Sequence, residues 1–382
     1  MKKTIILRTN KVDPDPRVEK EANSLLKVND LQVFINAWDR DGKYRWRLEK
    51  LDLPDGQVDI YRIGIKGTWG KGMRSNLFPT IRYEFKLFLW LLKNGKKFDY
   101  IHACDLMTGL PALIPAKIYK KKLIYDCCDY YSDSQRGPKI VLKILKKLET
   151  TVINHSDVTL LCSEKRINQI KPAKPKEVVY IHNSPNMKQF DINNNSKRIC
   201  KSSSKKLKLV YVGNFCEDRW LIPFLENSKK LNDIVEVHIG GFGGLEPDII
   251  KIANSSDNIF FYGKLKYEDV LKLENECDCI AAFYETTIMN HIYAAPNKFY
   301  EALALGKPLI MIKNSGMSEI VEKEKIGATF ETNFDSFKEA IISIENLIKK
   351  EKNLSKNEKS IFQSKYDWEI MEERLIDIYK KY

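Results

Sequence analysis

Residues 296–308 read Pro-Asn-Lys-Phe-Tyr-Glu-Ala-Leu-Ala-Leu-Gly-Lys-Pro, a stretch that predicts a helix with its own start and stop signals. Pro296 suits the first helical position, and Gly306 marks the end. The free N–H groups of the first turn would face an anion, because the helix dipole makes that end positive. Lys298 is a cationic partner for phosphate in that turn, and Glu301 is a carboxylate that can accept ribose hydroxyls. An ordinary amphipathic helix of an α/β domain would show the same pattern.

The composition allows two domains and points to an acidic partner. The chain has 382 residues, of which 43% are hydrophobic, and its formal net charge is +13. Such a charge suits nucleic acid, anionic lipid or a phosphorylated ligand. No arginine-rich block, zinc-finger spacing or RNA-binding aromatic motif accompanies it, which disfavours nucleic acid. No apolar run approaches the roughly 18 residues of a spanning helix, and none reads as a signal peptide, so the sequence predicts a cytoplasmic protein.

Cysteine and aspartate spacing gives no sign of a metal. The eight cysteines are scattered, and Cys127-Cys128 and Cys277-x-Cys279 have no histidine nearby at metal-ligand spacing, which predicts buried thiols. Asp13-Pro14-Asp15 precedes a predicted helix and suits capping. The glycine-rich run 240–244 lacks the full spacing of a dinucleotide fingerprint. The sequence therefore predicts no metal site and no cofactor.

Short β-type runs alternate with helical patterns along the chain, which is typical of parallel α/β architecture. The first series of predicted strands covers residues 4–9, 31–38, 58–64, 100–105, 123–127, 158–163 and 178–183, with helices at 16–27, 109–119 and 140–155 between them. The second series covers residues 207–213, 235–241, 259–263, 279–284, 309–312 and 328–331, and a last helix covers 368–382.

A polar stretch separates the two series. Residues 191–206 contain Asn and Ser runs without apolar periodicity and are the predicted linker. We expect one doubly wound domain at 1–190, a second at 207–360, and a C-terminal helix within 361–382 that packs back towards the first domain. Two such domains would face a central cleft bounded by the carboxyl ends of their strands, where ligands of doubly wound sheets bind.

Several stretches, taken in order, resemble the GT-B-fold glycosyltransferases, and specifically their retaining family 4. Residues 296–308 are the most specific match, followed by Ser318-Glu319-Ile320-Val321. In the first domain the resemblance is carried by residues 15–22, 100–105, 110–112, 123–131 and 156–164. It implies transfer of a sugar from a UDP- or GDP-type nucleotide sugar to a hydroxyl of a glycan or lipid-linked glycan. Retention of anomeric configuration and a role in bacterial surface polysaccharide or glycoconjugate synthesis are implied in the same way.

The resemblance also places the donor and the catalytic groups. The expected donor site gathers residues from loops and helix starts: Gly213, Asn214, Arg219, Gly263, Lys264, Pro296, Asn297, Lys298 and Glu301. Lys298 and Arg219 would stabilise the charge that develops on the leaving diphosphate, and Gly263 would begin the loop that contacts the base. An ordinary surface arginine and a plain strand-to-helix turn remain the alternative interpretations of Arg219 and of the loop at Gly263.

Three residues at predicted strand ends of the first domain are further catalytic candidates. They are His102, Asp105 and Asp129. A carboxylate there would position the acceptor hydroxyl, and in an inverting enzyme Asp129 or Asp105 would remove its proton. His102 also fits a structural role at the end of its strand.

The sequence departs from the family pattern at two places. The family's signature has two glutamates separated by seven residues, and Tyr293 stands in the first place while Glu301 takes the second. The glycine-rich loop after the first strand is replaced by residues 8–13. These departures motivate an alternative hypothesis, in which the chain is a non-catalytic nucleotide-sugar-binding protein of the same fold. A sugar-nucleotide epimerase of the same fold is less favoured, because its carboxylate and histidine constellation is not evident.

Residues 74–97 combine aromatic and aliphatic side chains with arginine and lysine. A basic amphipathic helix of this kind can dock on anionic lipid. Packing of its apolar face on its own sheet is the other interpretation. Peripheral contact with the inner face of the cell membrane would suit an enzyme whose acceptor is lipid-linked.

Overall fold

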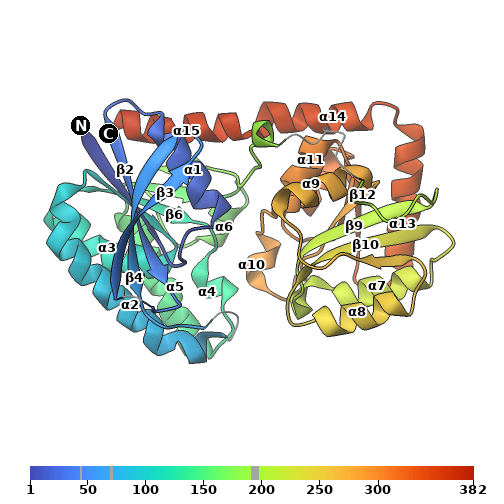
Figure 1. The fold of residues 1–382 in the computed structure, drawn as a ribbon, viewed down its shortest axis with the longest axis horizontal. Helices are drawn as coiled ribbons and strands as arrows, with labels where there is room; N and C mark the ends of the chain where they lie inside the picture. Colours follow the sequence, from blue (N-terminus) through green and yellow to red (C-terminus); the bar gives the residue numbers. More distant parts are fainter. Residues whose placement is uncertain (44, 69–71, 191–197) are drawn as a thin grey trace. The chain divides into compact units, whose positions relative to one another are not determined.

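The computed structural model describes residues 1–43, 45–68, 72–190 and 198–382. Contacts divide the chain into two compact units (Figure 1). Unit 1 consists of Met1–His182 together with Ile370–Tyr382, and unit 2 consists of Asn183–Glu369. The first part of the predicted linker, residues 191–197, lies outside the described residues.

The sheet of unit 1 has the strand order β3-β4-β2-β1-β5-β6-β7-β8. Its strands are β1 (Lys2–Arg8), β2 (Leu31–Asp39), β3 (Trp46–Leu53), β4 (Gly56–Gly64), β5 (Tyr100–Cys104), β6 (Lys122–Cys127), β7 (Val158–Leu161) and β8 (Val178–Tyr180). Neighbouring strands pair in parallel, apart from the antiparallel pair of β3 and β4. The order reverses at β1, which pairs with β2 on one side and β5 on the other. Ligands of doubly wound sheets bind at the carboxyl ends of strands at such a reversal.

Helices cover both faces of this sheet. They are α1 (Pro16–Leu26), α2 (Gly72–Asn94), η1 (Gly95–Lys97), α3 (Leu106–Ile118), α4 (Tyr131–Ser134), α5 (Lys139–His155), α6 (Arg166–Gln169) and nearly all of α15 (Trp368–Lys381). Ile5 and Leu7 of β1 pack with Tyr83 of α2 and Ala112 of α3. On the other face Thr4 lies 3.4 Å from the Tyr379 hydroxyl of α15. Figure 1 shows α2, α3 and α5 on one side of the sheet and α1 and α15 on the other.

The sheet of unit 2 is parallel, with the order β11-β10-β9-β12-β13-β14. Its strands are β9 (Leu207–Asn214), β10 (Val235–Phe242), β11 (Ile259–Phe261), β12 (Cys279–Ala282), β13 (Leu309–Ile312) and β14 (Gly327–Phe330). Successive side chains of β9 enter two different cores, with Leu209 and Tyr211 in one and Val210 and Val212 in the other. This sheet is therefore buried on both faces, as in other doubly wound folds.

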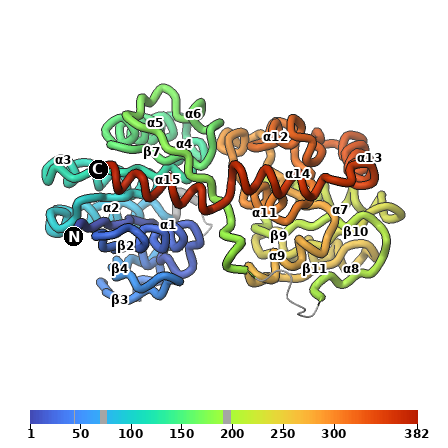
Figure 2. The backbone as a smooth tube through the Cα atoms, turned by 90° about the horizontal axis from the view of Figure 1, so that it is seen from above, coloured from blue at the N-terminus to red at the C-terminus, as the bar shows by residue number. Residues whose placement is uncertain are grey.

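The helices of unit 2 complete the two cores. They are α7 (Leu221–Lys229), α8 (Glu246–Asn254), α9 (Tyr267–Glu276), α10 (Met289–Ile292), α11 (Asn297–Leu305), α12 (Ser318–Lys323), α13 (Phe334–Lys350) and α14 (Leu354–Ile361), with short turns η2 (Met187–Gln189), η3 (Glu217–Arg219) and η4 (Phe362–Tyr366). Helices α7, α8 and α13 contribute to one core, and α9, α11 and α14 to the other. Figure 2 shows α11 beside α14, in agreement with their contacts.

The fold class predicted from the sequence is confirmed, with differences in detail. Strand β3 was not predicted, because its exposed, charge-rich sequence lacks a buried face. The division between units falls at His182–Asn183 rather than at residue 190, since Met187 packs on the second core of unit 2 and Phe190 lies edge-on to Tyr267. At the other end, the division falls within α15 rather than at residue 361. No helix of the described residues is long and apolar enough to cross a membrane.

Candidate active site

The donor-side candidates of unit 2 follow the carboxyl ends of adjacent strands. Gly213 and Asn214 end β9, which pairs with β10 on one side and β12 on the other. Gly213 lies opposite Gly241, and the Gly241 N–H donates to the carbonyl of Gly263 at 2.7 Å. The structure thus brings Gly213 and Gly263 to one edge of the sheet, joined through a glycine that sequence analysis did not assign to the site.

Gly241 is needed because the backbone is crowded here. Its φ is +142°, and a Cβ at this position would lie 1.8 Å from the carbonyl oxygen of Gly213. A Cβ on Gly243 would lie 2.5 Å from the carbonyl oxygen of Phe215. The glycine-rich run therefore lets the loop after β10 pack against the loop after β9.

Helix α11 presents its first turn as the sequence predicted, with one shift in position. Pro296 is the N-cap, with φ −69° and ψ 138°, so the helix begins at Asn297 instead of at the proline. The Phe299 N–H donates to the Pro296 carbonyl, which leaves the N–H groups of Asn297 and Lys298 ahead of the first helical hydrogen bond. Gly306 ends the helix in the left-handed conformation, with φ +69°. The free amide groups and the helix dipole suit an anion at this end.

Lys298 occupies space that a side chain at position 213 would take. Its Nζ would lie 2.9 Å from a Cβ on Gly213, and it sits 4.9 Å from the centre of the Tyr211 ring. The ammonium group is therefore held at the carboxyl end of β9, where the sequence analysis expected the diphosphate. Asn297 is oriented separately, because its Oδ1 accepts a hydrogen bond of 2.9 Å from Asn183.

Glu301 is buried and anchored one turn into α11. Only 4% of the residue is exposed, and its Oε1 accepts a hydrogen bond of 2.8 Å from the Tyr267 hydroxyl of α9. Burial and the neighbouring Glu301 carboxylate raise the pKa of Tyr267, which keeps the phenol protonated as the donor. Burial and Glu301 also raise the pKa of Glu274, a fully buried residue of α9, well above its usual value. The raised pKa favours the protonated form of Glu274.

Arg219 is fixed by aromatic and polar contacts. Its Nη1 donates to His291 Nε2 at 2.8 Å, and its guanidinium stacks 4.0 Å from the centre of the Tyr284 ring. His291 Nδ1 lies 2.9 Å from the Glu285 carbonyl, which fits the neutral tautomer with its proton on Nδ1. Asp218 pairs with Arg219 at 3.4 Å. These contacts argue against a mobile surface arginine, and the roles of His291 and Tyr284 were missed because nothing in their spacing signals them.

Gly263 and Lys264 follow β11 at the edge of the sheet. Gly263 has φ +68°, and Lys264 Nζ lies 5.0 Å from the centre of the Phe242 ring. The predicted residues of unit 2 therefore lie at the carboxyl ends of β9, β11 and β12, or in the segments that follow these strands.

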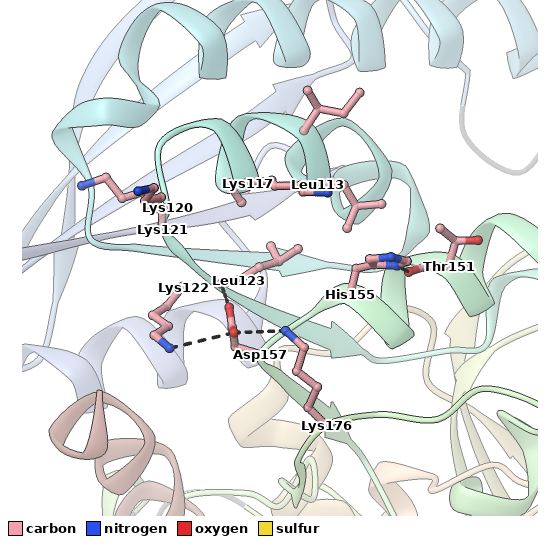
Figure 3. Close-up of a pocket in the computed structure, with 12 residues that line it drawn as sticks. Leu113, Lys117, Lys120, Lys121, Lys122, Leu123, Thr151, His155, Asp157 and Lys176 are labelled. Atoms are coloured by element: carbon pink, nitrogen blue, oxygen red, sulfur yellow. Dashed lines mark hydrogen bonds and ion pairs between the residues drawn. The ribbon is translucent and has the colours of Figure 1, made fainter.

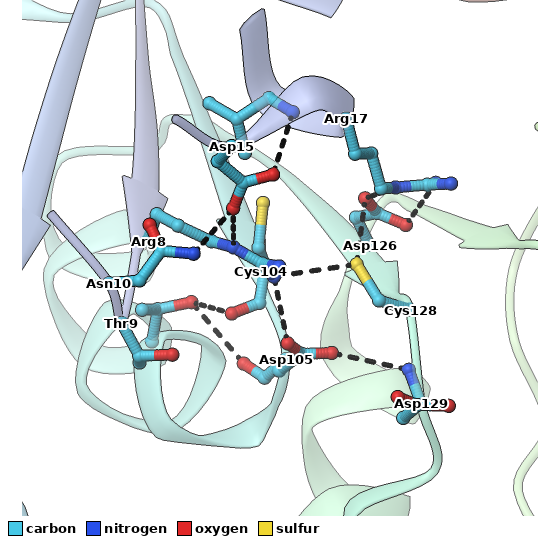
Figure 4. A network of polar contacts seen from close by, with 12 residues as sticks. Arg8, Thr9, Asn10, Asp15, Arg17, Cys104, Asp105, Asp126, Cys128 and Asp129 are labelled. Atoms are coloured by element: carbon cyan, nitrogen blue, oxygen red, sulfur yellow. Dashed lines mark hydrogen bonds and ion pairs between the residues drawn. The ribbon is translucent and has the colours of Figure 1, made fainter. Parts of the chain in front are cut away.

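In unit 1, Arg8 organises the acceptor-side candidates (Figure 4). Arg8 is the last residue of β1, and it donates to Asp15 at 2.7 Å and to Asp105 at 2.9 Å. Asp105 Oδ1 also accepts the Asp129 N–H at 3.4 Å. Burial raises the pKa of Asp105 to about 6, against the lowering effect of Arg8. The arginine in the loop region that replaces the expected glycines therefore holds a candidate carboxylate.

Asp129 lies on the surface but is paired. Its side chain is 60% exposed, and its Oδ1 accepts a hydrogen bond of 2.9 Å from Arg166, which is 2% exposed. Arg166 also donates to Cys162 and Gln169. Asp105 and Asp129 are thus brought together at the ends of β5 and β6, each with an arginine partner.

His102 does not belong to this surface. Its side chain has no exposed area, its Nδ1 lies 3.0 Å from the Tyr379 hydroxyl, and burial lowers its pKa to about 4. It points towards α1 and α15 because alternate residues of β5 face opposite sides of the sheet. The structure therefore corrects the expectation of a catalytic role and places His102 in the core of unit 1.

Beneath the site, a buried ion pair joins α1 to β6. Arg17 donates to both carboxylate oxygens of Asp126, at 2.8 and 2.9 Å, and lies 3.1 Å from Glu21. Although burial opposes it, Arg17 lowers the pKa of Asp126. Burial raises the pKa of Glu21 to about 8. One negative charge therefore balances Arg17 at neutral pH.

Two clusters of buried side chains have ligand atoms within 4.8 Å of one another. They are Cys200, His238 and Cys277 in unit 2, and His102, Cys104 and Asp126 in unit 1. Cys277 has no histidine at metal-ligand spacing in the sequence, but His238, which is distant in sequence, is adjacent to it in the fold. Neither cluster includes a donor-side candidate.

Unit 1 also contains a lysine-rich pocket away from these residues (Figure 3). Its volume is 540 Å³, and its lining includes Lys117, Lys120, Lys122 and Lys176. Asp157 pairs with Lys176 at 3.3 Å and Lys122 at 3.9 Å. Lys122 begins β6, so the pocket lies at the amino end of that strand, opposite the end that leads to Asp129.

Comparison with solved structures identifies the fold. Sucrose-phosphate synthase from Thermosynechococcus elongatus superposes with a TM-score of 0.76 at 14% identity, covering 100% of this chain and 99% of that one. Anabaena HepE in complex with UDP gives 0.68 at 13% identity with 100% of both chains covered. A glycosyltransferase from Rickettsia africae gives 0.68 at 14% identity, covering 100% and 98%. At these identities the likeness is one of fold.

Comparison of the sequence with protein-family models identifies the family. No curated protein matches the chain. The family model described as "Glycosyl transferases group 1" matches residues 163–361, which is more than half of the chain and includes every donor-side candidate. The chain therefore belongs to the group 1 glycosyl transferases.

Proposed function

We propose that this glycosyltransferase uses a UDP-type sugar donor bound by unit 2 and an acceptor hydroxyl positioned by unit 1. The observation that carries the proposal is the position of Lys298, held at the carboxyl end of β9 in the first turn of α11. The nucleotides named in the solved structures of similar fold support UDP first, since HepE was solved with UDP and with UDP-glucose. GDP-type donors are the second choice.

The residues of unit 2 have distinct roles in this proposal. Lys298 and the free N–H groups at the start of α11 stabilise the charge that develops on the β-phosphate as the bond to the sugar breaks. Arg219 supplies a second fixed cation. Glu301 accepts the ribose hydroxyls while Tyr267 fixes its carboxylate. Gly213 and Asn214, with Gly263 and Lys264, line the donor with backbone groups, and Pro296 and Asn297 set the helix start.

Asp105 and Asp129 act on the acceptor as positioning carboxylates in this proposal. An inverting enzyme needs a general base that takes the acceptor proton. Arg8 holds Asp105 and Arg166 holds Asp129, which gives each carboxylate a fixed orientation. The resemblance to the retaining family 4 supports the retaining reaction, in which the product keeps the donor's anomeric configuration. The anomeric configuration of the product, read by NMR, checks this, and an inverted product would make Asp105 or Asp129 the base.

The proposed transfer needs no metal ion. Two arginine or lysine side chains and a helix start supply the positive charge on the diphosphate side, which is the role a divalent cation plays in other transferases. Turnover is therefore expected to continue in excess chelator. Loss of turnover that returns with added Mg²⁺ or Mn²⁺ would contradict this.

Contact with an anionic membrane surface forms part of the proposal and accords with a role in surface glycan synthesis. Helix α2 buries Tyr83, Leu87 and Leu91 completely, yet Phe78 is 85% and Phe85 is 60% exposed. An apolar face left in water next to basic side chains suits anionic lipid.

Co-sedimentation with vesicles tests the membrane contact. Binding should require anionic lipid, weaken with salt, and fall in the double variant Phe78→Ser and Phe85→Ser. Ile348→Ser, which removes a surface side chain that is 39% exposed in unit 2, is the matched control. Equal binding to neutral vesicles, or none to either kind, would contradict the contact.

Thermal unfolding with UDP, GDP, ADP and CMP tests the donor site. A ligand at 100 times its dissociation constant stabilises a native site by about 2.7 kcal/mol. UDP should raise the melting temperature of the wild type and have a much smaller effect on Lys298→Ala and Glu301→Ala. Lys349→Ala, on the surface of α13, is the control. A protein that none of these nucleotides stabilises would contradict the proposed donor site.

A further inference from the structure

Two cysteines and a histidine of unit 2 meet in the interior. They are Cys200, which precedes β9, Cys277, which follows α9, and His238 of β10. Their ligand atoms lie within 4.8 Å of one another, and Cys200 Sγ lies 3.8 Å from His238 Nε2. Cys200 is 6% exposed, and the other two residues are fully buried. The proposed sugar transfer uses none of the three side chains.

The spacing of these three ligand atoms suits a zinc ion. Zinc binds thiolate sulfur at about 2.3 Å and imidazole nitrogen at about 2.0 Å in a tetrahedral arrangement, so the ligand atoms of such a site lie about 3.5–3.8 Å apart. The distance from Cys200 Sγ to His238 Nε2 already has this value. The remaining distances are at most 4.8 Å, so a small movement of Cys277 brings all three ligand atoms onto one ion.

Backbone hydrogen bonds hold Cys200 beside Cys277 without any ion. Cys200 lies in the predicted linker, and Cys277 is the C-cap of α9. Glu276, the residue before Cys277, accepts hydrogen bonds from the backbone N–H groups of Cys200 at 2.6 Å and of Ile199 at 3.0 Å. Two cysteines that are distant in sequence are thus fixed at one place, which lowers the entropy lost when they bind a ligand together.

The imidazole of His238 is fixed in orientation through its other ring nitrogen. Its Nδ1 lies 2.8 Å from the Tyr262 hydroxyl, and its ring stacks on Phe260 with the ring centres 5.1 Å apart. The same hydroxyl accepts the N–H of Lys201, the residue after Cys200, at 2.9 Å. A hydrogen bond at one ring nitrogen sets the tautomer of ligating histidines. With its proton on Nδ1, His238 has Nε2 available as a metal ligand.

A buried carboxylate stands beside His238 Nε2. Glu236 lies two residues before His238 on β10, so both side chains occupy the same face of the sheet. Glu236 Oε2 lies 3.9 Å from His238 Nε2, and the residue is 4% exposed. Among the described residues, this oxygen has no hydrogen-bond partner. A buried carboxylate without a partner is unfavourable, and a cation bound by the two cysteines and His238 would supply the partner.

We propose that Cys200, Cys277 and His238 bind a structural zinc ion, with Glu236 as the fourth ligand. Each thiol gives up its proton as its sulfur binds the metal. Two thiolates and an imidazole suit zinc, whereas calcium and magnesium take oxygen ligands. Sequence spacing could not indicate this site, because its ligands come from three separate segments that only folding brings together.

The ion stabilises unit 2 and takes no part in sugar transfer. It joins the predicted linker to β10 and to the end of α9. Cys277 precedes the amino end of β12, whereas the donor-side residues lie at the carboxyl ends of the strands or follow them. The zinc site therefore differs in place and in role from the diphosphate site, where the proposed transfer needs no metal.

Titration of the reduced, metal-free full chain with Co²⁺, which has a visible spectrum where Zn²⁺ has none, tests the site. The wild type should show a thiolate-to-cobalt charge-transfer band and the strong ligand-field bands of tetrahedral coordination, and Zn²⁺ should displace the cobalt. Cys200→Ala, Cys277→Ala and His238→Gln should each lose the tetrahedral bands. Cys279→Ala is the matched control, because Cys279 is also fully buried, two residues from Cys277, but packs in the other core of unit 2.

Two milder variants separate loss of the ion from loss of the fold. Tyr262→Phe keeps every ligand but removes the hydroxyl that orients His238, and it should weaken zinc binding by about tenfold, measured by competition with a zinc-binding dye. Glu236→Gln should also weaken it. Zn²⁺ should raise the melting temperature of the wild type and of Cys279→Ala, but not that of Cys277→Ala.

Several outcomes would overturn the proposal. A cobalt spectrum without a charge-transfer band, or equal cobalt binding by the wild type and Cys277→Ala, would show that the cysteines are not ligands. Thiol titration of the unfolded protein, prepared without reductant, should find all eight cysteines free, and a disulfide between Cys200 and Cys277 would replace the metal site. UDP affinity should be the same with and without zinc. A lower UDP affinity in the zinc-free protein would refute the separation of this site from the donor site.

Discussion

At Lys298 the position of one ammonium group depends on a neighbour that has no side chain. A Cβ on Gly213 would lie 2.9 Å from Lys298 Nζ, and the colliding atom is the end of a flexible chain. Crowding there is relieved by movement of the lysine rather than of the backbone. In the proposed donor site, this glycine therefore serves binding more than folding.

Gly213→Ala is thus expected to weaken UDP binding while the protein stays folded. The displaced lysine loses its position next to the diphosphate, and an interaction between charged groups contributes about 1.5–3 kcal/mol. Calorimetric titration with UDP gives the affinity, and the melting temperature without ligand should stay close to that of the wild type. Unchanged UDP affinity would show that Lys298 does not touch the diphosphate.

Gly241→Ala, in contrast, should lower the stability of the folded protein. Its Cβ would meet the carbonyl oxygen of Gly213 at 1.8 Å, and its φ of +142° is unfavourable for alanine. A loss of more than about 1 kcal/mol in the free energy of unfolding is expected, measured with urea. Gly244→Ala is the matched control, because nothing lies within 4 Å of its Cβ. Equal losses in both variants would refute the close approach.

Glu84 gives a pH dependence that can be measured. Burial raises its pKa in the folded protein to about 7, so the folded state binds a proton more tightly than the unfolded chain does. The corresponding stability is fully present below the unfolded pKa, near 4.3 for glutamate, and is lost as the pH rises through 7. Glu84→Gln should therefore gain in melting temperature relative to the wild type on going from pH 5 to pH 8. A constant difference across this range would refute a buried, titrating Glu84.

Elements with a simple apolar pattern could be predicted from the sequence, and elements defined by their surroundings could not. Buried strands such as β13 (Leu309–Ile312) were found at their exact bounds because four apolar residues follow one another between Pro308 and Lys313. Strand β3 has exposed charges on both faces and is specified by its antiparallel partner β4. Local pattern carries no information on such a partner.

The residues of the candidate site were likewise predicted only where a local pattern marks them. Helix α11 was recognised because proline, lysine and glycine stand at fixed offsets from one another. Tyr267 and His291 come from other helices and orient Glu301 and Arg219 through contacts that only folding creates. His102 was misplaced because the sequence gives the end of a strand but not the face that its last side chains occupy.

For the molecule as a whole, the last helix, α15, helps to form the core of unit 1, which also contains residue 1. Tyr379 of α15 has its hydroxyl 3.0 Å from His102 Nδ1, and the Tyr100 hydroxyl donates to the Tyr379 carbonyl at 3.0 Å. Met371, Leu375 and Tyr379 are almost fully buried. The last helix is therefore part of the core of unit 1.

Tyr379→Phe should destabilise unit 1 and leave UDP binding intact. It removes one buried hydroxyl and leaves His102 Nδ1 without that partner, which costs about 1–3 kcal/mol. Amide hydrogen exchange should become faster in β1 and β5 but not in β9 or β12. Faster exchange in both units alike, or a lower UDP affinity, would mean that the two units unfold as one.

The division of unit 1 into two separated stretches has a consequence for how the protein is made. Residues 370–382 leave the ribosome after all of unit 2, so Thr4, Tyr100 and His102 are synthesised long before the helix that covers them. Until then this face of the sheet lacks the helix that covers it, so unit 1 remains incomplete on the nascent chain. A stop codon that removes only these last residues would therefore damage the first sheet made, while unit 2, which is continuous in sequence, would have every residue it needs.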